Sequence, residues 1–153
     1  MSPDKDLVSS RTLPDGTVLV ESARGTARLT RLGPSALLCV CTGVLSTDFY
    51  TPMVAPAQRE MEQSGRLSMF VDGWDLRSVD TGFREAWTEW FKRHKQHFGM
   101  RLLVRTKLMD MAASLANLFT GMNVVKTYSS VASWERACSQ DFPSFRGRAK
   151  AAG

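Results

Sequence analysis

Residues 69–84 read MFVDGWDLRSVDTGFR, and this stretch decides the fold class that we assign to the chain. It opens with an apolar run that ends at Asp72, as a buried strand does. A short polar link follows, and Asp80, Thr81 and Gly82 then precede a helical pattern. The stretch therefore predicts a strand that is joined to a helix by a polar turn.

The helix after this joint, predicted over residues 79–98, has the clearest amphipathic pattern of the chain. Apolar patterning predicts further strands at residues 17–22, 27–32, 36–44, 66–72, 100–106 and 123–128. Between or after them, helices are predicted at residues 53–64, 108–122 and 131–138. Because helices alternate with the later strands, we expect a single α/β domain with a mixed, mostly parallel β-sheet and alternating helices.

The length and composition fit one soluble domain with polar ends. The chain has 153 residues, of which 43% are hydrophobic and 23% charged, and a domain of this size can bury a core without metal or disulfide help. We expect a flexible N-terminal segment at 1–16, the ordered domain at 17–141 and a basic flexible tail at 142–153. Contact between this tail and an acidic partner is the alternative interpretation.

Charge and hydropathy limit the classes of partner. The net charge is +5, and three of the basic residues, Arg146, Arg148 and Lys150, lie in the last eleven residues without an acidic neighbour. The rest of the chain lacks the basic stripe with interleaved aromatic residues that nucleic-acid binders use, so we expect no specific nucleic-acid binding. No apolar run reaches the length of a membrane span or a signal peptide, which favours a cytoplasmic location.

Three stretches give the chain a resemblance to a known family: MFVDGWDLRSVDTGF, LLVRTKLMDMAASLANLFTG and YSSVASWERAC. Over about residues 17–139 the chain resembles a STAS domain of the SpoIIAA-like branch. Anti-sigma factor antagonists share this fold, and Sec14-type lipid-transfer domains are distantly similar to it. The resemblance implies a non-enzymatic signalling domain that binds a protein partner, typically an anti-sigma kinase or a larger signalling complex.

The family joins a strand ending in an acidic or amide residue to an Asp-Ser-Ser-Gly at the next helix start. Asp72 and Asp80 keep the family spacing of eight positions. The second serine, which is the phosphate acceptor in regulated members, corresponds to Gly82, which has no hydroxyl. With one residue deleted from the joint, Thr81 becomes the candidate phospho-acceptor.

We therefore take the joint as the candidate partner-binding site, with Asp72, Asp75, Ser78, Asp80, Thr81 and Gly82 as its residues. A phosphate on Thr81 would lie at a helix N-terminus, where unpaired backbone N–H groups stabilise anions. The alternative is simple capping of the helix by the side chain of Asp80 or Thr81. The acidic residues have no histidine or metal-ligand spacing beside them, so we expect no catalytic residues.

The cysteines and histidines are expected to have structural roles. Cys39 and Cys41 share one face of a strand, and Cys138 is distant in sequence, which favours reduced, buried thiols. His94 and His97 lack a third metal ligand, so we expect no metal and no other cofactor.

The predicted helix at 108–122 is apolar around most of its circumference. Three interpretations stay open: a homodimer or partner interface, the wall of a pocket for an apolar small molecule or lipid, and burial within the monomer. For the first two, the candidate residues are Met109, Leu115, Phe119 and Met122. Binding of an apolar ligand by this helix is our alternative to the regulatory function.

Overall fold

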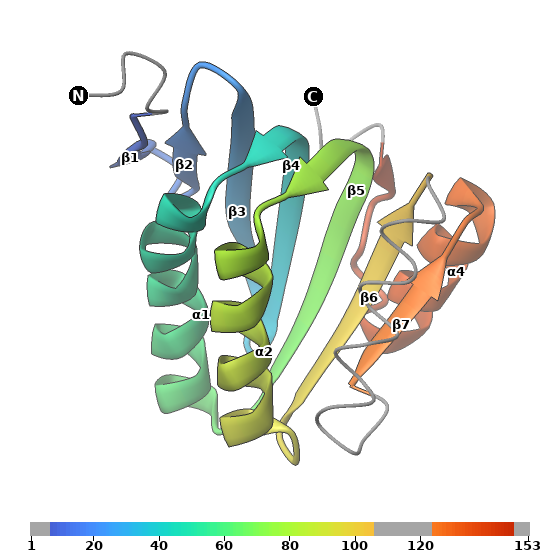
Figure 1. The fold of residues 1–153 in the computed structure, drawn as a ribbon. Helices are drawn as coiled ribbons and strands as arrows, with labels where there is room; N and C mark the ends of the chain where they lie inside the picture. The colour runs from blue at the N-terminus through green and yellow to red at the C-terminus, as the bar shows by residue number, and fades with distance from the viewer. Residues whose placement is uncertain (1–6, 106–123, 149–153) are drawn as a thin grey trace.

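Seven strands form one sheet whose spatial order is the order of the chain, β1 to β7 (Figure 1). The computed structural model describes residues 7–105 and 124–148. The strands are β1 Ser9–Thr12, β2 Val18–Glu21, β3 Gly25–Gly33, β4 Ala36–Leu45, β5 Leu67–Val79, β6 Phe98–Val104 and β7 Val125–Tyr128. Strands β1 to β4 pair antiparallel, and β4 to β7 pair parallel. The prediction of a mixed sheet in a single α/β domain is confirmed.

Helices cover both faces of this sheet (Figure 1). Helix α1, Tyr50–Ser64, follows a short 3-10 helix η1, Thr47–Phe49, and connects β4 to β5. Helix α2, Thr81–His94, connects β5 to β6 and lies beside α1 on the same face. Helix α4, Val131–Asp141, packs on the opposite face. Parallel strands need crossover connections of this kind, which explains why helices alternate with β4 to β7.

Each face of the sheet has its own hydrophobic core. Leu37, Cys39 and Cys41 point from β4 into the core under α1 and α2. Leu38, one position along, points into the core under α4. Because side chains alternate along a strand, the continuous apolar run of β4 fills both cores. Strand β4 is therefore covered on both faces.

The helix boundaries follow local chemistry. Helix α1 begins three residues earlier than predicted, since Pro52 lies in its first turn, where a missing N–H breaks no helical hydrogen bond. It ends at Gly65, which has a φ of 75° and donates its N–H to the Met61 carbonyl. Helix α4 begins at the predicted residue, Val131, after Ser130, whose Oγ accepts a hydrogen bond from the Ser133 N–H at 3.3 Å.

Helix α1 is tied to β3 through a buried carboxylate. Glu60 has 3% of its side chain exposed, and its Oε1 accepts a hydrogen bond of 2.6 Å from Arg31 Nε. Its Oε2 accepts from the Ser35 N–H at 2.9 Å and from Ser64 Oγ at 2.6 Å. The hydrogen bond from Arg31 leads the causes that lower the pKa of Glu60 to about 2, against desolvation that opposes the shift.

The sheet and its packing extend beyond the expected domain limits of residues 17 and 141. Strand β1 lies within the expected flexible segment 1–16 and pairs with β2. In the expected tail 142–153, Phe145 is buried and packs edge to face on Trp134 and Phe70, with ring centroids 5.4 and 5.8 Å apart. The described part of that tail therefore belongs to the core under α4. The helix predicted at 108–122 lies outside the described residues, together with Met109, Leu115, Phe119 and Met122.

Candidate functional site

Strand β5 runs through the joint that the sequence analysis places after Asp72. It continues to Val79, and its pairing with β4 includes Thr42 opposite Asp75 and Leu45 opposite Val79. The predicted strand end at Asp72 is therefore wrong. Seven strand residues lie between Asp72 and Asp80, and eight steps of about 3.3 Å place the two at most roughly 26 Å apart. The candidate residues of the joint thus divide into two separate sites.

The first site is formed by Asp72 and Asp75, and both carboxylates have arginine partners. Asp72 is 3% exposed, and its Oδ2 lies 2.8 Å from Arg148 Nε in an ion pair without hydrogen-bond alignment. Its Oδ1 accepts a hydrogen bond from the Trp74 N–H at 3.1 Å. Asp75 Oδ2 accepts from Arg148 Nη2 at 3.0 Å, while its Oδ1 lies 3.8 Å from Arg105. These carboxylates hold the C-terminal segment against the sheet.

The second site is the start of α2, where Asp80 and Thr81 are both exposed. Asp80 is the N-cap residue with an extended backbone, but its side chain makes no capping hydrogen bond. Thr81 Oγ1 accepts a hydrogen bond of 3.2 Å from Arg84 Nη2. The predicted side-chain capping of this helix is therefore wrong, because neither side chain bonds to the first-turn amides. Ser78, half-buried, pairs with Val44 within the sheet.

Gly82 has no room for a side chain. A Cβ atom there would lie 2.5 Å from Thr47 Oγ1 and 2.9 Å from Thr47 Cγ2. Real Cβ atoms do not approach other atoms so closely, so Thr47 would have to move before a serine fitted at this position. This contact explains the departure from Asp-Ser-Ser-Gly at Gly82 and leaves Thr81 as the hydroxyl in the first turn of α2.

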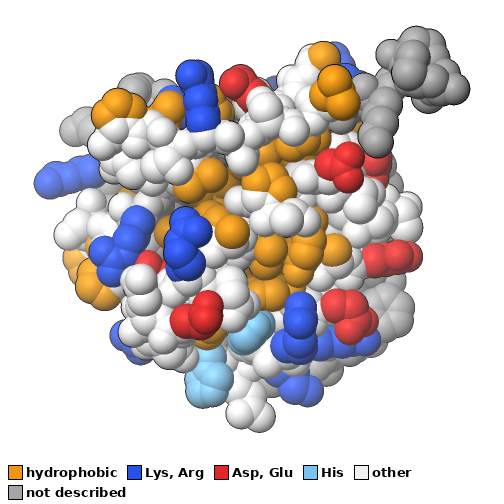
Figure 2. Space-filling model, turned by 90° about the vertical axis from the view of Figure 1, so that its left-hand side faces the viewer, with side chains coloured by type: hydrophobic (Ala, Val, Ile, Leu, Met, Phe, Trp, Pro, Cys, Tyr) orange, Lys and Arg blue, Asp and Glu red, His pale blue; other side chains and the backbone are white. Residues whose placement is uncertain are grey.

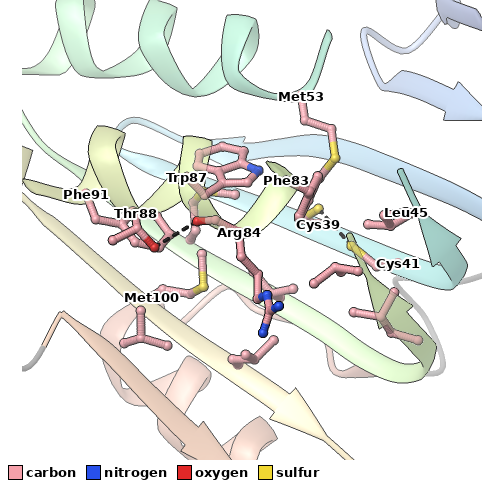
Figure 3. A pocket seen from close by; sticks show the side chains of 16 residues that line it. Cys39, Cys41, Leu45, Met53, Phe83, Arg84, Trp87, Thr88, Phe91 and Met100 are labelled. Carbon is pink, nitrogen blue, oxygen red and sulfur yellow. Dashed lines mark hydrogen bonds between the residues drawn. The ribbon is translucent and has the colours of Figure 1, made fainter. Parts of the chain in front are cut away.

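A cavity that the sequence analysis missed lies between α1, α2 and the sheet (Figure 3). Its volume is about 120 Å³, and its lining comes from α1, α2 and strands β4 to β7. The walls are almost entirely apolar, with Met53, Phe83, Trp87 and Leu102 among them. We call the cavity between α1, α2 and the sheet the α2 pocket. The outer face of the molecule that lies at the left of Figure 1 also has hydrophobic side chains gathered among charged ones (Figure 2).

Few polar groups line the α2 pocket. Among residues 7–105 and 124–148, Arg84 is the one charged residue in its lining, and Figure 3 shows the guanidinium directed across the cavity from α2. Thr88 lies one turn further along, and its Oγ1 donates a hydrogen bond of 2.8 Å to the Arg84 carbonyl. The pocket therefore combines an apolar body with a single cationic side chain.

Two thiols lie side by side in the pocket wall. Cys39 Sγ and Cys41 Sγ lie 3.5 Å apart, within a thiol–thiol hydrogen bond. That hydrogen bond and burial raise the pKa of Cys39 well above its usual range. Since a thiolate and not a thiol is the nucleophile, Cys39 is unreactive at neutral pH. All three cysteines are free and buried, which confirms the expectation of reduced, buried thiols.

The histidines lie at the other end of α2. The His94 ring packs on Trp90 with centroids 4.4 Å apart, and desolvation leads the causes that lower its pKa. His97 is exposed in the turn before β6. Within residues 7–105 and 124–148, no group of three His, Cys, Asp or Glu side chains is placed to hold a metal ion. No helix in the same ranges is long and apolar enough to cross a bilayer.

The strand order and the crossover helices together define a SpoIIAA-like fold, as the resemblance in the sequence implies. A solved structure with this fold is similar over most of its length: an uncharacterised protein of the DUF3478 family from Shewanella loihica PV-4. The TM-score is 0.51 at 14% sequence identity, covering 87% of this chain and 94% of that one. No protein-family model and no curated protein matches the sequence.

Proposed function

We propose that this chain is a non-enzymatic, STAS-type regulatory domain that binds a protein partner through the start of α2. The observation that carries the proposal is the exposed hydroxyl of Thr81 in the first turn of α2, within hydrogen-bond distance of Arg84. Asp80 lies beside it and is exposed as well. A surface made of one hydroxyl, one carboxylate and one guanidinium changes its charge pattern strongly when the hydroxyl is modified.

Phosphorylation of Thr81 is the switch in this proposal. A phosphate adds about −1.5 to −2 charges at neutral pH and favours helix N-termini and guanidinium partners. Here the phosphate would draw Arg84 toward itself and repel Asp80. A partner with an acidic or apolar contact surface would then bind more weakly.

Two further observations support a binding domain over an enzyme. The carboxylates of Asp72 and Asp75 are engaged by Arg148, and Cys39 is protonated at neutral pH, so these groups are poor bases and nucleophiles. A cytoplasmic location is part of the same proposal, since free cysteines are typical of reducing compartments. A regulatory kinase or a signalling complex is the kind of partner that we propose.

Affinity capture from host lysate tests the partner-binding surface. We expect a protein that is recovered with the wild type and Thr81→Ala but lost with Thr81→Glu. Thr51→Glu is the matched control, because Thr51 is an exposed threonine in the first turn of α1. Equal recovery of every protein by wild type and Thr81→Glu would contradict the switch.

A second candidate function is the binding of a small apolar molecule, and the α2 pocket is the observation that favours it. An engineered apolar cavity of about 150 Å³ binds benzene, so a cavity of about 120 Å³ limits the enclosed part of a ligand to at most about six heavy atoms. The apolar-ligand site was predicted on the helix at 108–122, whereas this second candidate function places it among the residues that line the α2 pocket. Longer lipids would fit only with a repacking of the walls.

Native mass spectrometry and ligand titration test the second candidate. We expect purified protein to take up hexan-1-ol or benzene with stabilisation against heat. Val71→Phe fills the pocket from β5, where Val71 is a lining residue, and should abolish uptake. Cys41→Met fills it by a smaller amount and serves as a second variant if the larger side chain prevents folding. A wild type that gains no stability from either compound would contradict this function.

A further inference from the structure

The α2 pocket has one feature that its apolar walls do not explain, namely the cationic side chain of Arg84 in its lining. A purely apolar molecule would need no charged group there. The guanidinium offers five N–H donors, and the contact seen in the structure, with Thr81 Oγ1, uses one of its nitrogens. Across residues 7–105 and 124–148, Arg84 forms no ion pair, unlike Arg31 and Arg148. Most of its donors are therefore open to a ligand.

The walls restrict where the polar part of a ligand can lie. Cys39, Leu45, Val71 and Leu102 offer no group that could compensate a buried charge, and burying an unpaired charge is costly. A charged group is acceptable only beside the guanidinium, which is exposed to solvent. A ligand of this pocket can thus have one polar end and must be apolar elsewhere.

The sign of the charge on the polar end of the ligand follows from the positive charge of Arg84. A guanidinium forms short, charge-assisted hydrogen bonds with carboxylates, often two at once, and repels ammonium groups. Thr88 offers no competing donor, since its one hydroxyl proton is donated to the Arg84 carbonyl. The polar end is therefore an anion, and a planar carboxylate matches the fork of the guanidinium best.

We propose that the α2 pocket binds a small carboxylic acid with an apolar body of about six heavy atoms, whose carboxylate pairs with Arg84. The proposal rests on the second candidate function and adds the chemical class of the ligand. Short fatty acids and small aromatic acids both meet this description. Because the pocket walls are apolar, the apolar part of the ligand breaks no hydrogen bond of the protein when it enters.

The experiment compares three six-carbon compounds with different polar ends: hexanoate, hexan-1-ol and hexylammonium. The apolar chain of hexanoate is one methylene shorter than that of the other two, so a preference for hexanoate cannot come from extra apolar contact. The full chain is labelled with ¹³C at its methionine methyl groups. Met53, Met69 and Met100 line the pocket and report binding directly, while Met61 is buried outside the lining and serves as the internal control. Titrations at low and high salt give a dissociation constant for each compound.

We expect hexanoate to bind about fivefold more tightly than hexan-1-ol at low salt, as a partly exposed ion pair allows, and hexylammonium to bind worst. Arg84→Met keeps the aliphatic stem and should make hexanoate no better than hexan-1-ol. Arg93→Met removes another exposed arginine of α2 and should leave the fivefold preference intact. High salt should reduce the preference for hexanoate in the wild type.

The outcomes separate this inference from the function on which it rests. Equal binding of hexanoate and hexan-1-ol by the wild type would overturn the carboxylate while leaving apolar ligand binding in place. A preference for hexanoate that survives in Arg84→Met would overturn the role of Arg84. If no compound shifts the signals of the three pocket methionines, both the carboxylate and the apolar-ligand function fall.

Discussion

Replacing Glu60 by glutamine gives the sharpest test of the electrostatics that fix α1 on the sheet. The carboxylate accepts hydrogen bonds from Arg31, Ser35 and Ser64, and only 3% of it is exposed. Glutamine has nearly the same shape but carries no charge and has one acceptor oxygen in place of two. The variant therefore removes the ion pair and leaves at least one buried donor without its partner.

The magnitude follows from the pKa of Glu60, which falls from the ordinary 4.5 to about 2. At about 1.4 kcal/mol per pKa unit, the ionised form would stabilise the fold by at most roughly 3.5 kcal/mol. Arg31 is 53% exposed, so solvent screens the pair, and we expect about 2 kcal/mol at pH 7. The pKa of Glu60 is lower in the folded protein than in the unfolded chain. Its contribution to the free energy of unfolding is therefore fully present above about pH 4.5 and is lost as the pH falls toward 2.

Urea unfolding followed by tryptophan fluorescence measures the difference between wild type and Glu60→Gln at several pH values. We expect about 2 kcal/mol from pH 7 to 5 and less than half of that at pH 3, since the carboxylate of the unfolded chain binds a proton there while the folded one, with its pKa of about 2, stays mostly ionised. Glu62→Gln alters an exposed glutamate of the same helix and should change stability by less than about 0.5 kcal/mol. A Glu60→Gln difference that is independent of pH between 7 and 3 would refute the reasoning.

Three further predictions concern the two sites and the pocket. Gly82→Ser should destabilise the fold by about 2 kcal/mol in urea unfolding, and adding Thr47→Ala should recover most of that loss; purely additive effects would contradict the contact. Arg148→Gln leaves Asp72 buried without a counterion and should cost about 2 to 3 kcal/mol by the same assay, so an unchanged midpoint would contradict the ion pair. Thr81→Glu should weaken hexanoate binding about threefold by competing for the neighbouring guanidinium, with hexan-1-ol unaffected; equal losses for both compounds would count against it.

Much of the fold could be predicted from local patterning. Strands β2, β3, β4, β6 and β7 and helices α1 and α4 lie within about three residues of where periodicity and turn residues indicate. Helix α2 ends at His94, four residues before the predicted end, and Phe98 begins β6. The main error concerns β5, because Gly73, Asp75 and Ser78 are residues typical of a turn. The signal that favours a strand was nevertheless present: Asp75 and Arg77 are exposed, and Leu76 between them is buried.

The sites were less predictable, since they depend on residues far apart in sequence. Arg148 reaches Asp72 across 76 positions, and its basic surroundings are typical of a solvated tail. The aromatic residue Phe145 within that tail was the available sign of packing. The α2 pocket is a void left where side chains from two helices and four strands meet, and no sequence pattern encodes such a volume.

The contact between Gly82 and Thr47 also constrains how this sequence can change over time. A serine at position 82 is unfavourable while Thr47 is present, yet it becomes acceptable once position 47 is smaller. The order of the two substitutions then matters, because one path passes through a destabilised intermediate and the other does not. A lineage with this pair would gain a hydroxyl at 82 only after losing the one at 47, whereas Thr81 can be exchanged in a single step.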